Sequence, residues 1–106
     1  MALWIKAKHD SRGSKVETVS PMRGETFSQS ELKQFVGSEL LHHLPMNDGH
    51  FMWISLKPSL PINLIASTIA HDETGIPLTE FINGDVLIAD ALESGMEKAF
   101  EAGNGQ

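Results

Sequence analysis

The chain contains no cysteine. This absence excludes a disulfide framework, catalysis by a thiolate and a zinc site built on cysteine ligands. It is typical of proteins that work in a reducing compartment. We therefore expect a cytoplasmic protein, and we expect no bound metal and no cofactor.

The chain also lacks a long apolar run. A membrane-spanning helix needs roughly 20 consecutive apolar residues, and no stretch approaches that length. A signal peptide begins with basic residues that are followed by a long apolar run. Residues 1–6 do not begin such a pattern, so we expect no signal peptide. The sequence thus predicts no membrane partner.

Basic residues are scarce in the second half of the chain. Up to Lys57 there are seven basic and six acidic residues; beyond it, Lys98 is the single basic residue against eight acids. Proteins that bind nucleic acid need the opposite balance to neutralise phosphates, so we expect no direct nucleic-acid binding. The acidic half is either a solvated surface or a surface that meets a basic partner, as a DNA mimic does.

What the chain does have is the composition of a folded domain. It has 106 residues, of which 41% are hydrophobic. This length and composition suit one domain with its own core. We predict a single domain over residues 1–102 and a flexible tail over residues 103–106, where Gly103 and Gly105 alternate with polar residues.

Two segments near the start have strand patterns. Apolar and polar residues alternate over residues 3–8, with Leu3 and Ile5 on one side and Trp4 on the other, which predicts a half-buried strand. Residues 15–19 are rich in β-branched side chains and are expected to return as a hairpin partner.

The clearest local signal is that of a first helix. Ser28 and Glu31 have the spacing of a capping box, in which each side chain accepts a hydrogen bond from the other residue's backbone amide. Leu32, together with Phe35 and Val36, forms an apolar stripe that ends at Gly37. We predict a short helix that docks on a sheet.

A hairpin is predicted over residues 39–56, with its turn at residues 45–49. If Leu44 pairs with His50, both faces of the hairpin are substantially apolar. One face then carries Leu40, His42, Leu44, His50, Met52, Ile54 and Leu56, and the other carries Leu41, His43, Phe51 and Trp53. A free antiparallel sheet keeps one face in water, so we expect a helix, another protomer or a ligand over the second face.

The remaining elements complete an α+β pattern. Helical spacing over residues 62–69 begins near Asn63, residues 86–91 predict a strand, and Met96, Ala99 and Phe100 predict a short final helix. We therefore predict an antiparallel or mixed sheet of about five strands with two to three helices packed on it.

Four short segments carry a resemblance to a known family: residues 32–37, 46–54, 60–68 and 84–88, the last two containing Leu-Pro-Ile-Asn and Gly-Asp-Val-Leu-Ile. Together these segments resemble domain of unknown function 3846, a family of small proteins of phages and other mobile elements. The stretch before Leu60 departs from the glycine-bearing turn of that family. The resemblance implies a mobile-element setting, hence a host-cell cytoplasm, and no enzymatic activity.

No recognised catalytic or metal motif is present. His42 and His43 are strand neighbours that point to opposite faces, so they do not share one ion, and no serine lies in a nucleophile elbow. The best candidate ligand-binding residues are Phe51, Trp53, Lys57, Asn63 and Thr68. An aromatic ring would stack a base, while the lysine and a helix start would receive phosphate. The alternative is that the rings pack, Asn63 caps a helix and Lys57 is solvated.

Two functions follow as hypotheses. The first is a small non-catalytic binding protein, a counter-defence protein that sequesters a nucleotide immune signal. The alternative is an acidic inhibitor or adaptor, similar to a DNA mimic, that acts on a host protein. In either case we expect a homo-oligomer, because the face that carries Phe51 and Trp53 needs cover.

Overall fold

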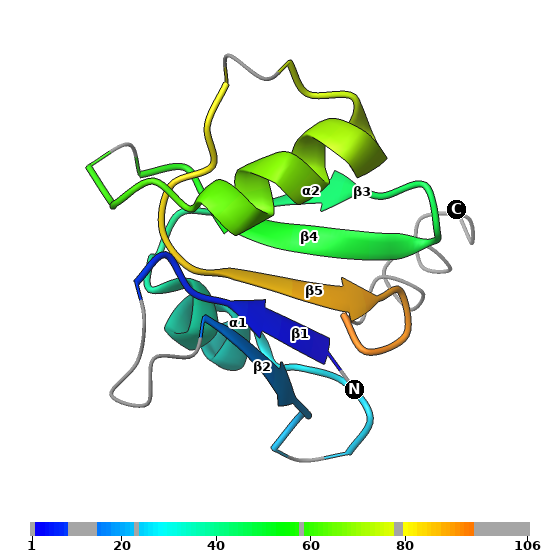
Figure 1. Cartoon of the computed structure of the whole chain (residues 1–106). Helices are drawn as coiled ribbons and strands as arrows, with labels where there is room; N and C mark the ends of the chain where they lie inside the picture. The colour runs from blue at the N-terminus through cyan, green and yellow to red at the C-terminus, as the bar shows by residue number, and fades with distance from the viewer. Residues whose placement is uncertain (1, 9–14, 23, 58, 78–79, 95–106) are drawn as a thin grey trace, which may run out of the picture.

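The computed structural model describes residues 2–8, 15–22, 24–57, 59–77 and 80–94 (Figure 1). Seven elements lie within these residues: β1 (Ala2–Ile5), β2 (Val16–Val19), α1 (Gln29–Val36), β3 (Leu41–Pro45), β4 (His50–Ser55), α2 (Leu64–Thr74) and β5 (Val86–Asp90). The expected final helix, the end of the predicted domain and the tail 103–106 lie outside the described residues. In the part that is described, no helix is long and apolar enough to cross a membrane.

The described strands form one five-stranded sheet in the order β2-β1-β5-β4-β3. Every neighbouring pair is antiparallel, so the sheet is antiparallel throughout and not mixed. The last strand, β5, inserts between β1 and β4 and joins the two hairpins. The α+β prediction is therefore confirmed, with two helices among the described residues.

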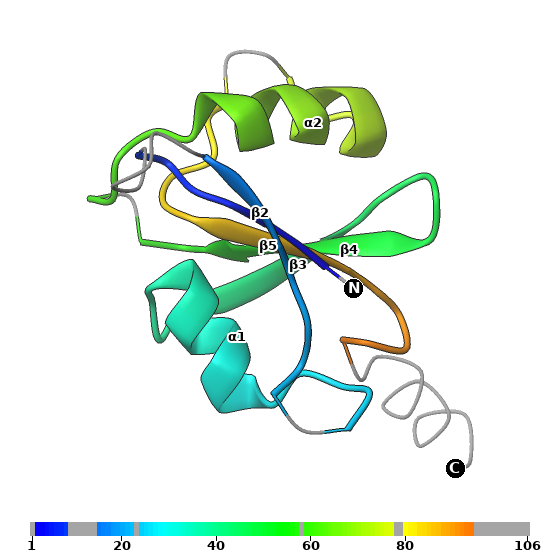
Figure 2. The same cartoon turned by 60° about the horizontal axis from the view of Figure 1, so that its bottom comes forward.

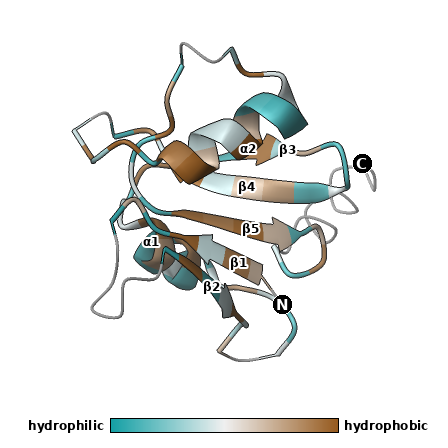
Figure 3. Cartoon of the chain, in the orientation of Figure 1, coloured by the Kyte–Doolittle hydropathy of each residue, from teal (hydrophilic) through white to brown (hydrophobic). Residues whose placement is uncertain are grey.

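The two helices lie on opposite faces of the sheet. Figure 2 shows the sheet nearly edge-on between α2 and α1. On the α2 face, Ala66 and Ala70 pack against a cluster that includes Met52 and Val86. On the α1 face, Leu32 and Phe27 pack with Leu87 and Ala89. Because both faces of β5 are covered, its residues from Val86 to Ala89 are all buried, and this strand is brown along most of its length in Figure 3.

Helix α1 forms where the local signals predict it. Ser28 accepts a hydrogen bond from the backbone amide of Glu31 at 3.1 Å, and Glu31 accepts one from the amide of Ser28 at 3.2 Å. Gly37 ends the helix in the left-handed conformation with φ 75°, which glycine adopts without steric strain. Leu32 and Val36 are buried, so the predicted stripe faces the sheet.

The hairpin of β3 and β4 has the predicted faces but a different register. Leu44 pairs with Met52 and Pro45 pairs with Phe51, so the expected pairing of Leu44 with His50 is wrong by two residues. Side chains alternate with a period of two, and a shift of two residues therefore leaves each side chain on its predicted face. Met52 and Ile54 accordingly join the α2 face, while Trp53 joins the α1 face.

The cover of the second face is helix α1. Trp53 packs in the same cluster as Phe27, Leu32 and Phe35. The first strand is covered on this side too, since Trp4 donates from Nε1 to the carbonyl oxygen of Phe35 at 2.9 Å. The face that led us to expect a second protomer is thus occupied largely by the chain itself.

Candidate functional site

The two candidate aromatic residues of β4 lie on the α1 face, inside an aromatic cluster. The ring of His43 lies 5.5 Å from that of Phe51 and 5.2 Å from that of Trp53, measured between centroids. Trp53 also donates from Nε1 to the hydroxyl of Ser94 at 3.0 Å. These side chains therefore make contacts within the protein, as the packing alternative predicts.

Asn63 lies on the other side of the sheet, at the start of α2, and is 1% exposed. Its Nδ2 donates to the carbonyl oxygens of Ile5 and Gly84 at 3.0 and 2.9 Å. Its Oδ1 accepts from the amide of Ala66 at 3.1 Å. Both amide hydrogens are used inside the chain, so this side chain has no donor left for a ligand.

The remaining two candidates are exposed. Thr68 donates from Oγ1 to the carbonyl oxygen of Leu64 at 3.0 Å, one turn earlier in α2. Lys57 follows the end of β4. The structure thus separates the five candidates: Phe51 and Trp53 lie on the α1 face, Asn63 and Thr68 belong to α2 on the opposite face, and Lys57 lies beyond the end of β4.

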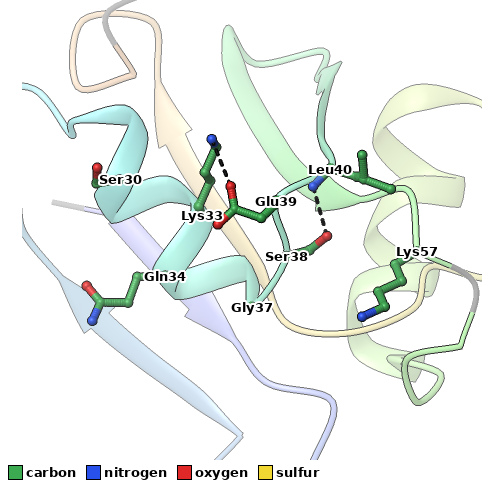
Figure 4. A pocket seen from close by; sticks show the side chains of 8 residues that line it. All are labelled: Ser30, Lys33, Gln34, Gly37, Ser38, Glu39, Leu40 and Lys57. Carbon is green, nitrogen blue, oxygen red and sulfur yellow. Dashed lines mark hydrogen bonds and ion pairs between the residues drawn. The ribbon is translucent and has the colours of Figure 1, made fainter.

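A hollow of about 660 Å³ lies beside Lys57 (Figure 4). It is open to solvent and occupies the space between the C-terminal end of α1 and the segment after β4. The residues that line it are Ser30, Lys33, Gln34, Gly37, Ser38, Glu39, Leu40 and Lys57. Of our candidate residues, Lys57 alone lines this hollow. The sequence does not predict that Lys33 lies near Lys57, because their proximity depends on the order of the strands.

The electrostatics of this hollow combine one ion pair with one further cation. Lys33 Nζ lies 3.0 Å from Glu39 Oε2, and the Glu39 side chain is 84% exposed. Within the described residues Lys57 has no ion-pair partner. The hydroxyl of Ser38 accepts from the amide of Leu40 at 3.0 Å. Two ammonium groups against one carboxylate leave the lining with one net positive charge.

A second, smaller hollow of about 250 Å³ is also lined by this lysine. Its lining includes Leu56, Ile76 and Phe81 together with Glu80. Lys57 therefore lines both hollows.

Much of the acidic half serves the fold. Asp85 accepts from the amide of Ala7 at 2.9 Å, and Asp90 accepts from the amide of Glu93 at 2.7 Å. Glu93 is itself buried. Of the acids of this half that the structure describes, Asp72 and Glu80 are exposed, while Glu73, Asp85 and Asp90 are half-buried.

The rings of the strand neighbours His42 and His43 are stacked, with centroids 5.9 Å apart, and the other described histidines make separate contacts. His71 shares a hydrogen bond between Nδ1 and the carbonyl oxygen of Ile76 at 2.8 Å, and His50 Nδ1 lies 3.0 Å from Asp48 Oδ1. Backbone hydrogen bonding from the amide of His50 holds the pKa of Asp48 below its usual value. No three side chains of the metal-binding types lie close enough together to hold an ion in the part of the chain described above.

The fold defines an α+β domain in which an antiparallel sheet lies between two helices. Comparisons with protein-family models, with curated proteins and with solved structures found no match. The resemblance to domain of unknown function 3846 therefore stays a prediction.

Proposed function

We propose that this protein is a non-catalytic binding protein of phage or mobile-element origin, which captures a small nucleotide in the hollow beside Lys57. In this proposal it acts in the host cytoplasm as a counter-defence protein that sequesters a nucleotide immune signal. The observation that supports it is the pair of lysines, Lys33 and Lys57, that line one hollow of about 660 Å³. That volume is within the range of about 300–1,000 Å³ found for small-molecule sites.

The lining suits a phosphate group. Ammonium, hydroxyl and amide groups from Lys57, Ser30 and Gln34 are donors for anionic oxygens. The ion pair of Lys33 with Glu39 is exposed, and exposed pairs contribute about 0–1 kcal/mol, so a phosphate can compete for the lysine. Leu40 is 56% exposed and offers an apolar surface to a base or sugar. Capture of this kind breaks no bond and needs no catalytic group.

Titration calorimetry against a panel of cyclic and linear nucleotides tests this proposal. We expect heat with at least one nucleotide, a loss of about tenfold or more in affinity for Lys57→Gln, and weaker binding as salt rises. The matched control is Lys8→Gln, an exposed lysine that lines neither hollow. The absence of heat with every nucleotide, or an equal loss in both variants, would contradict the proposal.

The second candidate is an inhibitor or adaptor that binds a basic host protein. The exposed carboxylates of Asp72 and Glu80 favour it. Such a complex weakens as salt rises, since exposed charges are screened beyond a Debye length of about 10 Å at 0.1 M salt. A pull-down from host lysate at low and high salt, repeated with Asp72→Asn and Glu80→Gln, tests it. A complex that neither salt nor these variants weaken would argue against this candidate.

A further inference from the structure

Four large apolar side chains are exposed at one end of the molecule. They lie after β4, around the start of α2 and before β5: Leu56, Ile62, Leu64 and Phe81, with exposed fractions of 57%, 48%, 63% and 52%. Scattered single apolar residues are normal on a surface, whereas a contiguous group marks an interaction site.

Backbone hydrogen bonds bring these residues together. The amide of Asn63 donates to the carbonyl oxygen of Ile82 at 2.8 Å, and the amide of Gly84 donates to that of Pro61 at 2.6 Å. These bonds hold the two segments antiparallel, with Ile62 opposite Asn83. Asn63 and Ile82 point inward and are buried.

Because side chains alternate along an extended segment, Ile62 and Phe81 both point outward on the same side. Phe81 also lines the smaller hollow together with Leu56. We call the group Leu56, Ile62, Leu64 and Phe81 the end patch.

Two opposite charges lie beside part of the end patch. Lys57 and Glu80 line the same hollow as Leu56 and Phe81. Within the described residues neither has an ion-pair partner. A two-fold axis that passes between Lys57 and Glu80 places the lysine of each copy opposite the glutamate of the other, and the apolar side chains of the two copies against one another.

We propose that the end patch binds a second copy of this chain around a two-fold axis. The four apolar side chains form its centre, and Lys57 of each copy pairs with Glu80 of the other. A standard interface buries about 800 Å² on each partner, and four half-exposed side chains supply only its core. The dimer is therefore weak and depends on protein concentration.

The proposed dimer interface lies at a different place from the oligomer interface that the sequence predicts. The sequence favours the face of Phe51 and Trp53, but α1 covers Trp53 there. The proposal shares Lys57 with nucleotide capture, whereas its four apolar side chains and Glu80 play no part in that capture. Since Lys57 lines both hollows, its test uses protein free of nucleotide.

Sedimentation equilibrium across a wide range of protein concentrations tests the dimer. We expect Phe81→Asp to be monomeric at concentrations where the wild type dimerises. Leu64→Glu is a milder second variant, because glutamate is a good helix former and is favourable in a first helical turn. The matched control is Leu92→Asp, which replaces an exposed leucine just beyond the opposite end of β5 and leaves the dimer intact. Circular dichroism confirms that each variant is folded.

Charge reversal tests the two-fold arrangement. We expect Lys57→Glu and Glu80→Lys each to weaken the dimer by about tenfold, and the double variant to restore it. A wild type that stays monomeric at every concentration would overturn the proposal. So would dissociation by Leu92→Asp equal to that by Phe81→Asp, or a double variant as weak as the single ones.

Discussion

The side-chain amide of Asn63 donates a hydrogen bond to the backbone carbonyl oxygen of Ile5 at 3.0 Å, across 58 residues of the sequence. Its second amide hydrogen bonds the carbonyl oxygen of Gly84, and its Oδ1 caps α2 at the amide of Ala66. One buried side chain therefore joins the end of β1, the segment before β5 and the start of α2. Aspartate or serine can cap a helix, but neither can donate two hydrogen bonds at once.

This relationship predicts a pH-dependent loss of stability in Asn63→Asp. The carboxylate keeps the cap but places a buried negative charge against two carbonyl oxygens, and burial raises the pKa of such a carboxyl group. A folded-state pKa raised above the unfolded one means that the stability is highest at acidic pH and falls as the pH rises through the folded pKa. Urea unfolding of the variant is expected to give a lower stability at pH 7 than at pH 4.

The control for that experiment is Thr68→Ala in the same helix, whose hydroxyl is exposed and bonds only the carbonyl oxygen of Leu64. We expect it to change the free energy of unfolding by about 0.5 kcal/mol or less, with no added pH dependence. If Asn63→Asp were as stable at pH 7 as at pH 4, the side chain would have a different set of partners.

A side chain at position 84 is expected to destabilise the protein. Its φ is 81°, and a Cβ at this position would lie 2.7 Å from Leu60 Cδ1. Gly49 has a similar φ of 86° but open space around its Cα. We expect Gly49→Ala to be destabilised by about 1 kcal/mol through backbone strain, and Gly84→Ala by about 1–3 kcal/mol more through overpacking. Chemical denaturation measures both, and Leu60→Ala in the Gly84→Ala background should recover the steric part.

The hydrogen bond from Trp53 to Ser94 is expected to hold the turn after β5 against the sheet. Trp53→Phe and Ser94→Ala each remove one partner and should destabilise the protein by about 1–2 kcal/mol. A double-mutant cycle isolates the free energy of this hydrogen bond, because either substitution made in the background of the other has no hydrogen bond left to break. Strictly additive effects would show that this bond contributes nothing to stability.

We expect Glu31 to stabilise the folded protein at neutral pH and to lose this effect in acid. Backbone hydrogen bonds from Met22, at 2.9 Å, and from Ser28 hold its pKa below the ordinary value of 4.5. A depressed folded-state pKa stabilises the protein above the unfolded pKa, and this stabilisation is lost as the pH falls through the folded one. Glu31→Gln should therefore be less stable than wild type at pH 7, by about 0.5 kcal/mol because the site is exposed, and the difference should shrink well below pH 4.5.

Thermal or urea unfolding from pH 2 to pH 7 measures this difference. The control is Glu25→Gln, which removes the same charge from an exposed position outside the capping box. An identical pH profile for the two variants would mean that the capping box carries no stability of its own.

The features that depend on neighbouring residues were predictable from the amino-acid sequence. The capping box of Ser28 and Glu31, the end of α1 at Gly37 and the cap at Asn63 all involve residues within four positions of one another. The faces of the hairpin were equally readable, because alternation with a period of two needs no partner strand. These local signals were sufficient to predict the α+β class.

Tertiary structure alone decided the register, the cover of each face and the candidate site. Pairing Leu44 with Met52 in place of His50 preserves every face, so the hydrophobic pattern could not choose between the two registers. Lys33 and Lys57 come together only because the strand order puts the end of α1 beside the end of β4. Contacts between residues far apart in the sequence depend on the packing of whole elements, and no short segment carries that information.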